Sequence, residues 1–157
     1  SHQAQKELGL PKGHYILFSD VSNTPIKRRD IATEIVENIG HPYKLLIMCG
    51  VKPNEVPLYI NACDFVILTS DEEGSPNIIR EALALNKPFF SVKVGDAEYQ
   101  LKGLTNSTII SRDSIKAAKT IVEYIKRPYI DNTRVTLQGK IDFKIINESL
   151  IDLYEGI

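Results

Sequence analysis

The chain has 157 residues, 43% of them hydrophobic, and its 19 basic and 20 acidic side chains leave a net charge of −1. This length and composition predict one domain with a sizeable core. The balanced charge argues against binding to nucleic acid through bulk electrostatics. No apolar run approaches the roughly 20 residues that a membrane-spanning helix needs, and no signal peptide is recognisable.

The two cysteines, Cys49 and Cys63, lie in apolar surroundings and lack the spacing of a metal site or of a disulfide framework. We interpret both as thiols of the core. No other cluster of residues calls for a metal ion, so we expect none. A reducing, cytoplasmic setting fits this pattern best.

The N-terminal part of the chain alternates between predicted helices and strands. An unbroken apolar run at residues 14–19 is typical of a strand buried on both faces of a parallel sheet. Isoleucine recurs at every fourth position from Ile31 to Ile39, which predicts a helix that ends at Gly40. A short helix, a second strand and another short helix are predicted at residues 5–10, 45–49 and 54–62.

The chain is organised around the segment that follows. An apolar run at residues 64–69 predicts a buried strand. Beyond an acidic loop, Ser75 is expected to cap a helix whose first position is Pro76, where the missing N–H is not needed. Pro88 ends this helix. Such a junction offers free backbone N–H groups and the positive end of a helix dipole, so it suits an anion such as a phosphate.

Two carboxylates flank this junction: Glu73 in the loop and Glu81 on the helix, eight positions apart. Carboxylates repel phosphates, but they are strong acceptors for hydroxyl groups. The pair therefore predicts a ligand that carries both phosphates and hydroxyls.

The alternation continues with strands predicted at residues 88–92 and 108–110. A turn lies after the first of these strands, and its residue Asp96 is expected to cap a short helix that runs to Leu101.

Two helices with apolar stripes are predicted after the last strand. The first begins near Asp113 and stops before Pro128, and the second follows a polar stretch at residues 129–140. The stripes consist of Ile115, Ala118, Val122 and Ile125 in the first helix and of Phe143, Ile146, Leu150 and Leu153 in the second.

Short apolar strands that alternate with helices predict an α/β fold, in which a parallel sheet is covered by helices on both faces. Ligands of such sheets bind outside the carboxyl ends of the strands. The loops at those ends are residues 19–27, 50–54, 71–77 and 95–96, and we expect them to converge on one cleft.

The spacing from Glu73 to Glu81 matches the E-x7-E motif of family 4, a large family of retaining nucleotide-sugar glycosyltransferases with the two-domain GT-B fold. The resemblance extends over residues 4–157 and is densest between Tyr43 and Asp96. It implies a Rossmann-like parallel sheet flanked by helices, the C-terminal half of such an enzyme. The segments that carry it are residues 56–64, 68–70, 73–77, 81–84 and 94–96.

The resemblance also implies roles for individual residues. Glu81 would accept hydrogen bonds from the ribose of the donor, and Glu73, the catalytic candidate, would face the hydroxyls of the transferred sugar. Gly50 and Val51 would lie near the nucleobase. The backbone N–H groups that approach the sugar and the diphosphate belong to Gly74, Ser75, Asn77 and Ile78.

The family carries an Arg and a Lys after the first strand, and they balance the charge of the diphosphate. In this sequence no basic residue stands between Ser19 and Ser22, where the Arg is expected. Lys27 is our candidate for the Lys, with Arg28 as a substitute for the missing partner.

The resemblance implies that residues 1–157 are a single nucleotide-sugar-binding domain from a larger enzyme, whose N-terminal domain binds a sugar or lipid-linked acceptor. The donor would be a nucleoside diphosphate sugar such as a UDP- or GDP-sugar, transferred with retention and without a metal or other cofactor. Synthesis of a bacterial surface polysaccharide, at the inner face of the membrane, is the expected setting.

Two alternatives remain beside this interpretation, and a third is rejected. The altered Arg–Lys pair favours a degenerate module that keeps the GT-B fold but only binds partners. A sugar-nucleotide epimerase shares the fold, although the run from Glu73 to Ala82 fits the transferases better. A receiver-type signalling domain fits the length, but only one acidic residue, Asp20, follows the first strand.

Overall fold

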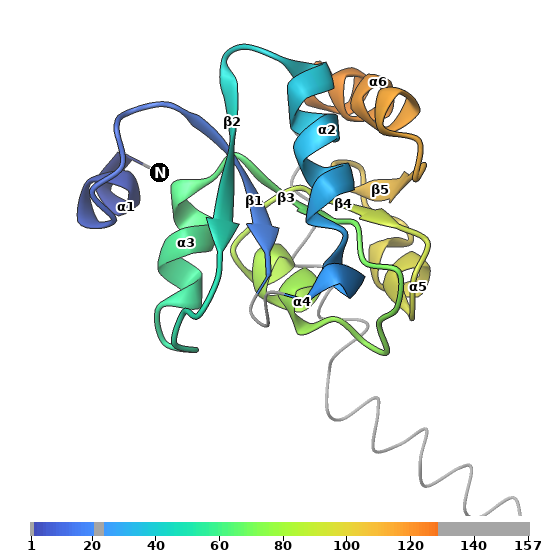
Figure 1. Ribbon diagram of the computed structural model, residues 1–157, viewed down its shortest axis with the longest axis horizontal. Helices are drawn as coiled ribbons and strands as arrows, with labels where there is room; N and C mark the ends of the chain where they lie inside the picture. The colour runs from blue at the N-terminus through green and yellow to red at the C-terminus, as the bar shows by residue number, and fades with distance from the viewer. Residues whose placement is uncertain (1, 21–23, 129–157) are drawn as a thin grey trace, which may run out of the picture.

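The computed structural model describes residues 2–20 and 24–128 (Figure 1). The predicted last helix, with its stripe from Phe143 to Leu153, lies outside the described residues. Within the described part of the chain, no helix is long and apolar enough to cross a membrane.

The described strands form one five-stranded sheet in the order β2-β1-β3-β4-β5, and every neighbouring pair is parallel. This arrangement confirms the predicted Rossmann-like α/β fold, because a parallel sheet needs a crossover connection between successive strands. The strands are β1 (His14–Ser19), β2 (Tyr43–Met48), β3 (Phe65–Leu68), β4 (Phe89–Val92) and β5 (Thr108–Ile110).

Helices cover both faces of the sheet (Figure 1). Helices α2 and α6 pack together on one face, whereas α3, α4 and α5 follow one another on the other, with α1 packed against α3. The helical elements are α1 (His2–Glu7), the 3₁₀-helix η1 (Pro25–Lys27), α2 (Arg29–Ile39), α3 (Val56–Ala62), α4 (Asn77–Ala84), α5 (Ala97–Leu101) and α6 (Ser114–Ile125).

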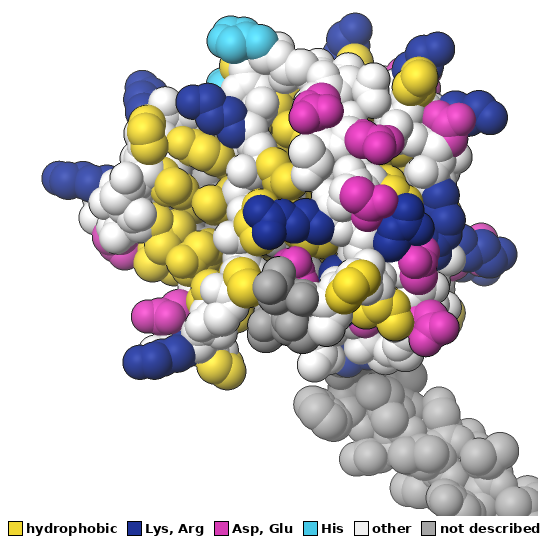
Figure 2. Space-filling view, viewed as in Figure 1, with side chains coloured by type: hydrophobic (Ala, Val, Ile, Leu, Met, Phe, Trp, Pro, Cys, Tyr) yellow, Lys and Arg dark blue, Asp and Glu magenta, His cyan; other side chains and the backbone are white. Residues whose placement is uncertain are grey.

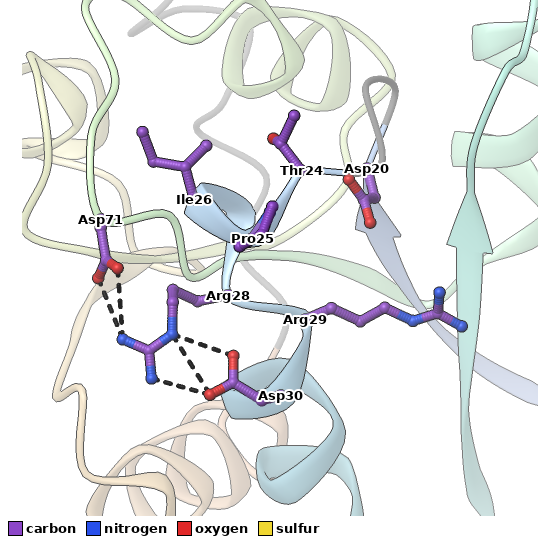
Figure 3. Close-up of a pocket in the computed structure, with 8 residues that line it drawn as sticks. All are labelled: Asp20, Thr24, Pro25, Ile26, Arg28, Arg29, Asp30 and Asp71. Atoms are coloured by element: carbon purple, nitrogen blue, oxygen red, sulfur yellow. Dashed lines mark hydrogen bonds and ion pairs between the residues drawn. The ribbon is translucent and has the colours of Figure 1, made fainter.

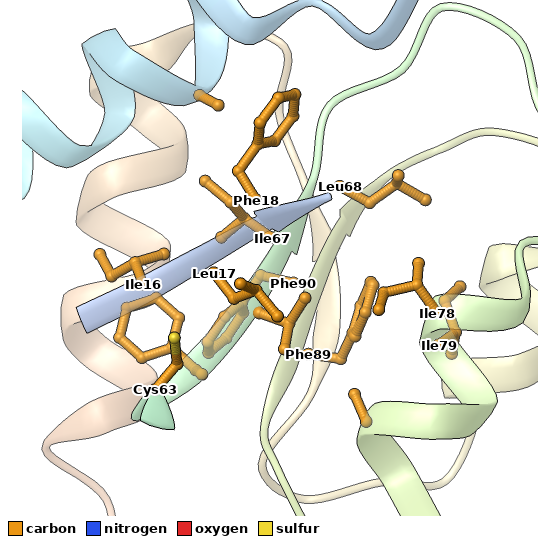
Figure 4. Close-up of a cluster of buried hydrophobic side chains, with 14 of the residues drawn as sticks. Ile16, Leu17, Phe18, Cys63, Ile67, Leu68, Ile78, Ile79, Phe89 and Phe90 are labelled. Atoms are coloured by element: carbon orange, nitrogen blue, oxygen red, sulfur yellow. The ribbon is translucent and has the colours of Figure 1, made fainter. Parts of the chain in front are cut away.

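The core lies on both sides of the three central strands (Figure 4). All four residues of β3 and all four of β4 are buried, which explains why these segments read as unbroken apolar runs. Phe90 packs edge-to-face against Phe65, with ring centroids 5.3 Å apart, and against Tyr124 of α6 at 5.8 Å. These rings join the sheet to the α6 layer.

The edge strand β2 is less covered than the central strands. Leu45, Leu46 and Ile47 are only half-buried, and hydrophobic side chains gather on the surface in the region of β2 and α3 (Figure 2). Elsewhere on this face, charged side chains of both signs are interspersed.

The first helix occupies residues 2–7 rather than the predicted 5–10. Gly9 adopts φ +67°, and the N–H groups of Gly9 and Leu10 donate to the carbonyls of Lys6 and Gln5. This is the Schellman pattern that ends a helix, and it stops the helix before Pro11 is reached.

Helix α4 begins one residue later than predicted, and Ser75 does not cap it. Pro76 is the residue at the N-cap, with extended backbone, and α4 starts at Asn77. The Ser75 hydroxyl instead donates to Asp96 Oδ2 at 2.7 Å. Asp96 does stand before α5 as predicted, but its side chain makes no capping hydrogen bond because it accepts from Ser75 and Gln100.

Helix α6 confirms its predicted cap, because Asp113 Oδ1 accepts from the Lys116 N–H at 2.9 Å. Its predicted apolar stripe is wrong at the first turn, where Ile115 is 55% exposed. The residues that α6 buries fully are Ala117, Ala118 and Ile121. Two of these three residues are alanines, so the buried face of α6 is made largely of small residues instead of the most apolar ones.

We predict that Phe90→Ala destabilises the fold by about 3–5 kcal/mol, because it leaves a cavity between β3, β4 and α6. Urea denaturation followed by circular dichroism measures this change. Ile115→Ala is the matched control and should stay within about 0.5 kcal/mol of the parent, since its side chain is largely in solvent. Equal effects of the two changes would contradict the assignment of the core.

Candidate functional site

A cavity of about 260 Å³ opens at the carboxyl ends of β1, β2 and β3, beside the N-terminus of α4. We call it the central cavity. Its lining combines apolar side chains with charged groups. It is lined by Ser19, Lys27, Met48, Val51, Pro53, Val56, Leu68, Glu73, Pro76, Asn77, Ile78 and Glu81.

The central cavity brings together most of the residues predicted from the sequence to form one site. Four predicted residues are not part of its lining: Arg28, Gly50, Gly74 and Ser75. The predicted residues that line it are Lys27, Val51, Glu73, Asn77, Ile78 and Glu81.

The shortest ion pair of the cavity joins Lys27 to Glu73. Lys27 Nζ donates to Glu73 Oε1 at 2.6 Å, and the Ser70 hydroxyl donates to the same oxygen at 2.7 Å. The side chain of Glu73 is only 14% exposed and that of Lys27 only 22%. Both donors engage Oε1, so the carboxylate is held in one orientation with Oε2 outside these two bonds.

Glu81 projects from the second turn of α4 into the same cavity. Partial burial raises the pKa of its carboxyl above the ordinary value, because desolvation disfavours the charged form. A hydroxyl donor from a ligand would relieve this penalty, so Glu81 is suited to accept hydrogen bonds.

The first turn of α4 contributes backbone donors to the cavity. The N–H groups of Asn77 and Ile78 belong to the helix start, which has no intrahelical acceptors for them. They add the positive end of the helix dipole to the charge of Lys27. Pro76, the residue before them, has no N–H to offer.

Apolar lining residues come from the end of β2, the β2–α3 connection and the start of α3. Gly50 adopts φ +65°, a left-handed conformation that turns the chain after β2. Val51 then lines the cavity together with Met48, Pro53 and Val56. A flat apolar group such as a nucleobase fits a lining of this kind.

Arg28 lies on a different hollow, which α2 borders (Figure 3). Its guanidinium donates to Asp30 at 2.8 Å and to Asp71 at 3.3 Å, and the bond to Asp30 lowers the pKa of that carboxyl. The geometry therefore does not bring Arg28 to Lys27 as a second cation of the central cavity. Asp20 also lines this hollow, and it is buried, with an Oδ1 that no described residue hydrogen-bonds.

The turn after β4 supports the loop that carries Glu73. Asp96 N–H donates to the Gly74 carbonyl at 3.1 Å. A Cβ on Gly95 would collide with the Gly74 carbonyl and come within 2.7 Å of the Glu73 carbonyl oxygen. Gly95 is therefore required by close approach as well as by its φ of +49°.

The sequence analysis assigned no site role to three residues that hold this site together: Thr69, Ser70 and Arg112. Their contacts join segments about 40 positions apart in the chain, such as Thr69 to Lys27 and Arg112 to Ser70. No spacing rule signals contacts of this kind. Among residues 2–20 and 24–128, no group of three or more His, Cys, Asp or Glu side chains could hold a metal ion.

The chain matches no family model and no curated protein sequence. Solved structures do match. HepE from Anabaena, in a crystal structure with UDP-glucose, superposes with a TM-score of 0.78 at 16% identity over 99% of this chain and 52% of that chain. A glycosyltransferase from Rickettsia africae gives 0.75 at 13% identity over 99% of this chain and 51% of its own.

The C-terminal domain of a glycosyl transferase group 1 family protein, LpcC from Francisella tularensis, gives a TM-score of 0.67 at 17% identity. That match covers 88% of this chain and 91% of the other. The chain thus spans about half the length of the two larger structures and most of the single domain. The similarities establish the fold of GT-B glycosyltransferase domains.

We predict that Gly95→Ala destabilises the protein by roughly 2–4 kcal/mol, the sum of a left-handed backbone penalty and of overpacking against the Gly74 carbonyl. Gly103→Ala is the control, since Gly103 has φ +85° but nothing within 4 Å of an added Cβ. It should cost only about 1–2 kcal/mol. Chemical denaturation of both variants measures the difference, and equal costs would contradict the close approach.

Proposed function

We propose that the central cavity binds a nucleoside diphosphate sugar, and that this chain is the donor-binding, C-terminal half of a retaining family 4 GT-B glycosyltransferase. One observation carries the proposal. The cavity joins Lys27, Glu73 and Glu81 to the N-terminus of α4 at the carboxyl ends of three parallel strands. This is the edge at which open α/β sheets bind their ligands.

Each part of the donor has a matching part of the cavity. The apolar lining around Val51 receives the nucleobase, and Glu81 accepts from the ribose hydroxyls. Lys27 and the first N–H groups of α4 face the diphosphate. Glu73 accepts from the transferred sugar through the oxygen that Lys27 and Ser70 leave outside their bonds.

The charges in the cavity indicate which groups bind the diphosphate and which bind the hydroxyls. Lys27 stands against two carboxylates in the lining, and Arg28 is held elsewhere by Asp30 and Asp71. The diphosphate must therefore rely on backbone N–H groups more than on side-chain cations. Hydroxyl-accepting carboxylates, which are strong hydrogen-bond partners, carry the rest of the affinity.

The wider function goes beyond this half of the molecule. An N-terminal domain would bind the sugar or lipid-linked acceptor, and transfer would occur between the two domains. Peripheral membrane association, at the cytoplasmic face, and synthesis of a bacterial surface polysaccharide are part of this proposal. HepE, which has the same fold, was crystallised with UDP-glucose, so a UDP-sugar is the first donor to test.

A second candidate function is a degenerate GT-B module that binds partners without catalysis. It is favoured by the internal ion pairs, since Lys27 is already engaged by Glu73, and Arg28 by Asp30 and Asp71. A ligand has to compete with these pairs. The two candidates differ in whether the cavity binds nucleotides.

We predict that thermal unfolding of the chain shifts upward with one nucleotide of the series UDP, GDP, ADP, CMP and dTDP. At 100 times the dissociation constant the ligand adds about 2.7 kcal/mol, or roughly 5–10 °C for a domain of this size. A rise with one nucleotide supports the donor site and identifies the base. No rise with any, in this chain and in a longer chain with the proposed N-terminal domain, would favour the degenerate module.

We predict that Glu81→Ala weakens nucleotide binding roughly tenfold or more, because a hydrogen bond to a charged acceptor contributes about 1.5–3 kcal/mol. Isothermal titration calorimetry measures the affinity. Glu37→Ala, at an exposed position of α2 outside the cavity, is the matched control and should bind as the parent does. Unchanged affinity in Glu81→Ala would refute the ribose assignment.

A further inference from the structure

We infer that Arg112 is a positioning residue, which holds the β3–α4 loop (residues 69–76) so that Glu73 faces the donor. Arg112 lies between β5 and α6, outside the central cavity. It acts through the backbone of the loop and does not touch the ligand. The inference rests on the proposed function only in the role that it gives to Glu73.

The contacts of Arg112 converge on three consecutive residues at the end of β3. One guanidinium nitrogen donates to the Ser70 carbonyl at 2.9 Å. The other donates to Asp71 Oδ1 at 2.9 Å and to the Thr69 carbonyl at 3.4 Å. A planar guanidinium offers its donors in a fixed fork, so binding two successive carbonyls fixes the direction in which the chain leaves the strand.

Ser70 and Thr69 connect Arg112 to the charged groups of the cavity by hydrogen bonds, and both residues are completely buried. The Ser70 hydroxyl donates to Glu73 Oε1 at 2.7 Å. The Thr69 hydroxyl lies 3.0 Å from the Lys27 carbonyl and 2.9 Å from that of Arg28. Arg112 thus binds the carbonyls of Thr69 and Ser70. The side chains of these two residues in turn bind the backbone of Lys27 and the carboxylate of Glu73.

Asp71 links the β3–α4 loop to η1 and to two arginines. Its N–H donates to the Ile26 carbonyl at 2.8 Å, which ties the loop to η1, the 3₁₀-helix that carries Lys27. Its carboxylate accepts from both Arg28 and Arg112. Removal of Arg112 therefore leaves Asp71 with one cationic partner, so the loss falls on the loop carbonyls and not on an unpaired carboxylate.

The side chain of Arg112 is 41% exposed, and surface ion pairs contribute little to stability. We therefore expect Arg112→Ala to fold and to unfold within a few degrees of the parent. This separates a positioning role from a general structural one. Arg112→Lys keeps a positive charge near Asp71 but loses the fork, so it should restore little of the lost function.

The first test measures the loop without any ligand. Hydrogen exchange of the Asp71 amide, followed by NMR, should be about tenfold faster in Arg112→Ala than in the parent, because the bond to Ile26 opens more often. Arg127→Ala is the matched control: it removes an arginine from the opposite end of α6, where its guanidinium stacks on Tyr124. Unchanged Asp71 exchange in Arg112→Ala overturns the inference, whether or not the chain binds nucleotides.

The second test measures binding of UDP and UDP-glucose by calorimetry. In Arg112→Ala the affinity for UDP-glucose should fall roughly tenfold, the cost of one lost hydrogen bond to a charged acceptor, while the affinity for UDP changes less than about twofold. Ser70→Ala should likewise weaken binding of UDP-glucose more than binding of UDP. Ser70→Thr keeps the hydroxyl and should restore the affinity for UDP-glucose. Equal losses for both ligands would overturn the positioning of Glu73.

The two tests fail separately from the proposed function. If the parent chain binds neither UDP nor UDP-glucose nor any other nucleotide of the series, the proposed function fails while the exchange result still decides whether Arg112 holds the loop. If the parent binds UDP-glucose and Arg112→Ala binds it equally well, Arg112 does not position Glu73 for the sugar, and the role inferred for Arg112 in donor binding is overturned.

Discussion

The burial of β3 between β1 and β4 is the constraint on which the rest of the structure depends. All four residues of β3 are buried, and the strand pairs with parallel neighbours on both sides. Because both faces of the strand are covered, a shift in its register or orientation would break the close packing of its side chains on both sides. Its carboxyl end is therefore fixed, and the loop that starts there carries Glu73 to Lys27 and then begins α4. The central cavity is the consequence of where this one strand must stop.

The loop after β3 is held by contacts from two other segments of the chain. Arg112 binds the carbonyls of Thr69 and Ser70, while the turn at Gly95 packs against the backbone of Glu73 and Gly74. Polar groups that are already oriented need not pay the full entropic cost of ordering when a ligand arrives. This arrangement suits a site that recognises hydroxyls through direction rather than through net charge.

The electrostatics of the site are largely satisfied within the protein. Lys27 pairs with Glu73, and Arg28 and Arg112 share Asp71. This pairing gives Lys27 and Glu73 a partner of opposite charge in a small cavity, whereas Glu81 has no ion pair among the described residues. A diphosphate that enters this cavity would have to compete with Glu73 for Lys27. The first N–H groups of α4 have no intrahelical acceptor, so they are the donors most available to an anion.

The sequence by itself determined the alternation of elements, the boundaries of β1 and β5, and the two glutamates. These are local features: apolar runs, turn residues and motif spacing depend on neighbours in the chain. Only the tertiary structure decided that Ser75 bonds to Asp96 instead of capping α4, that Ile115 faces solvent, and that Arg28 turns away from Lys27. The tertiary structure also places Arg112 against the β3–α4 loop, although Arg112 is 43 positions from Thr69 in the chain. These outcomes depend on which groups compete for the same partner in space, and a one-dimensional pattern carries no record of that competition.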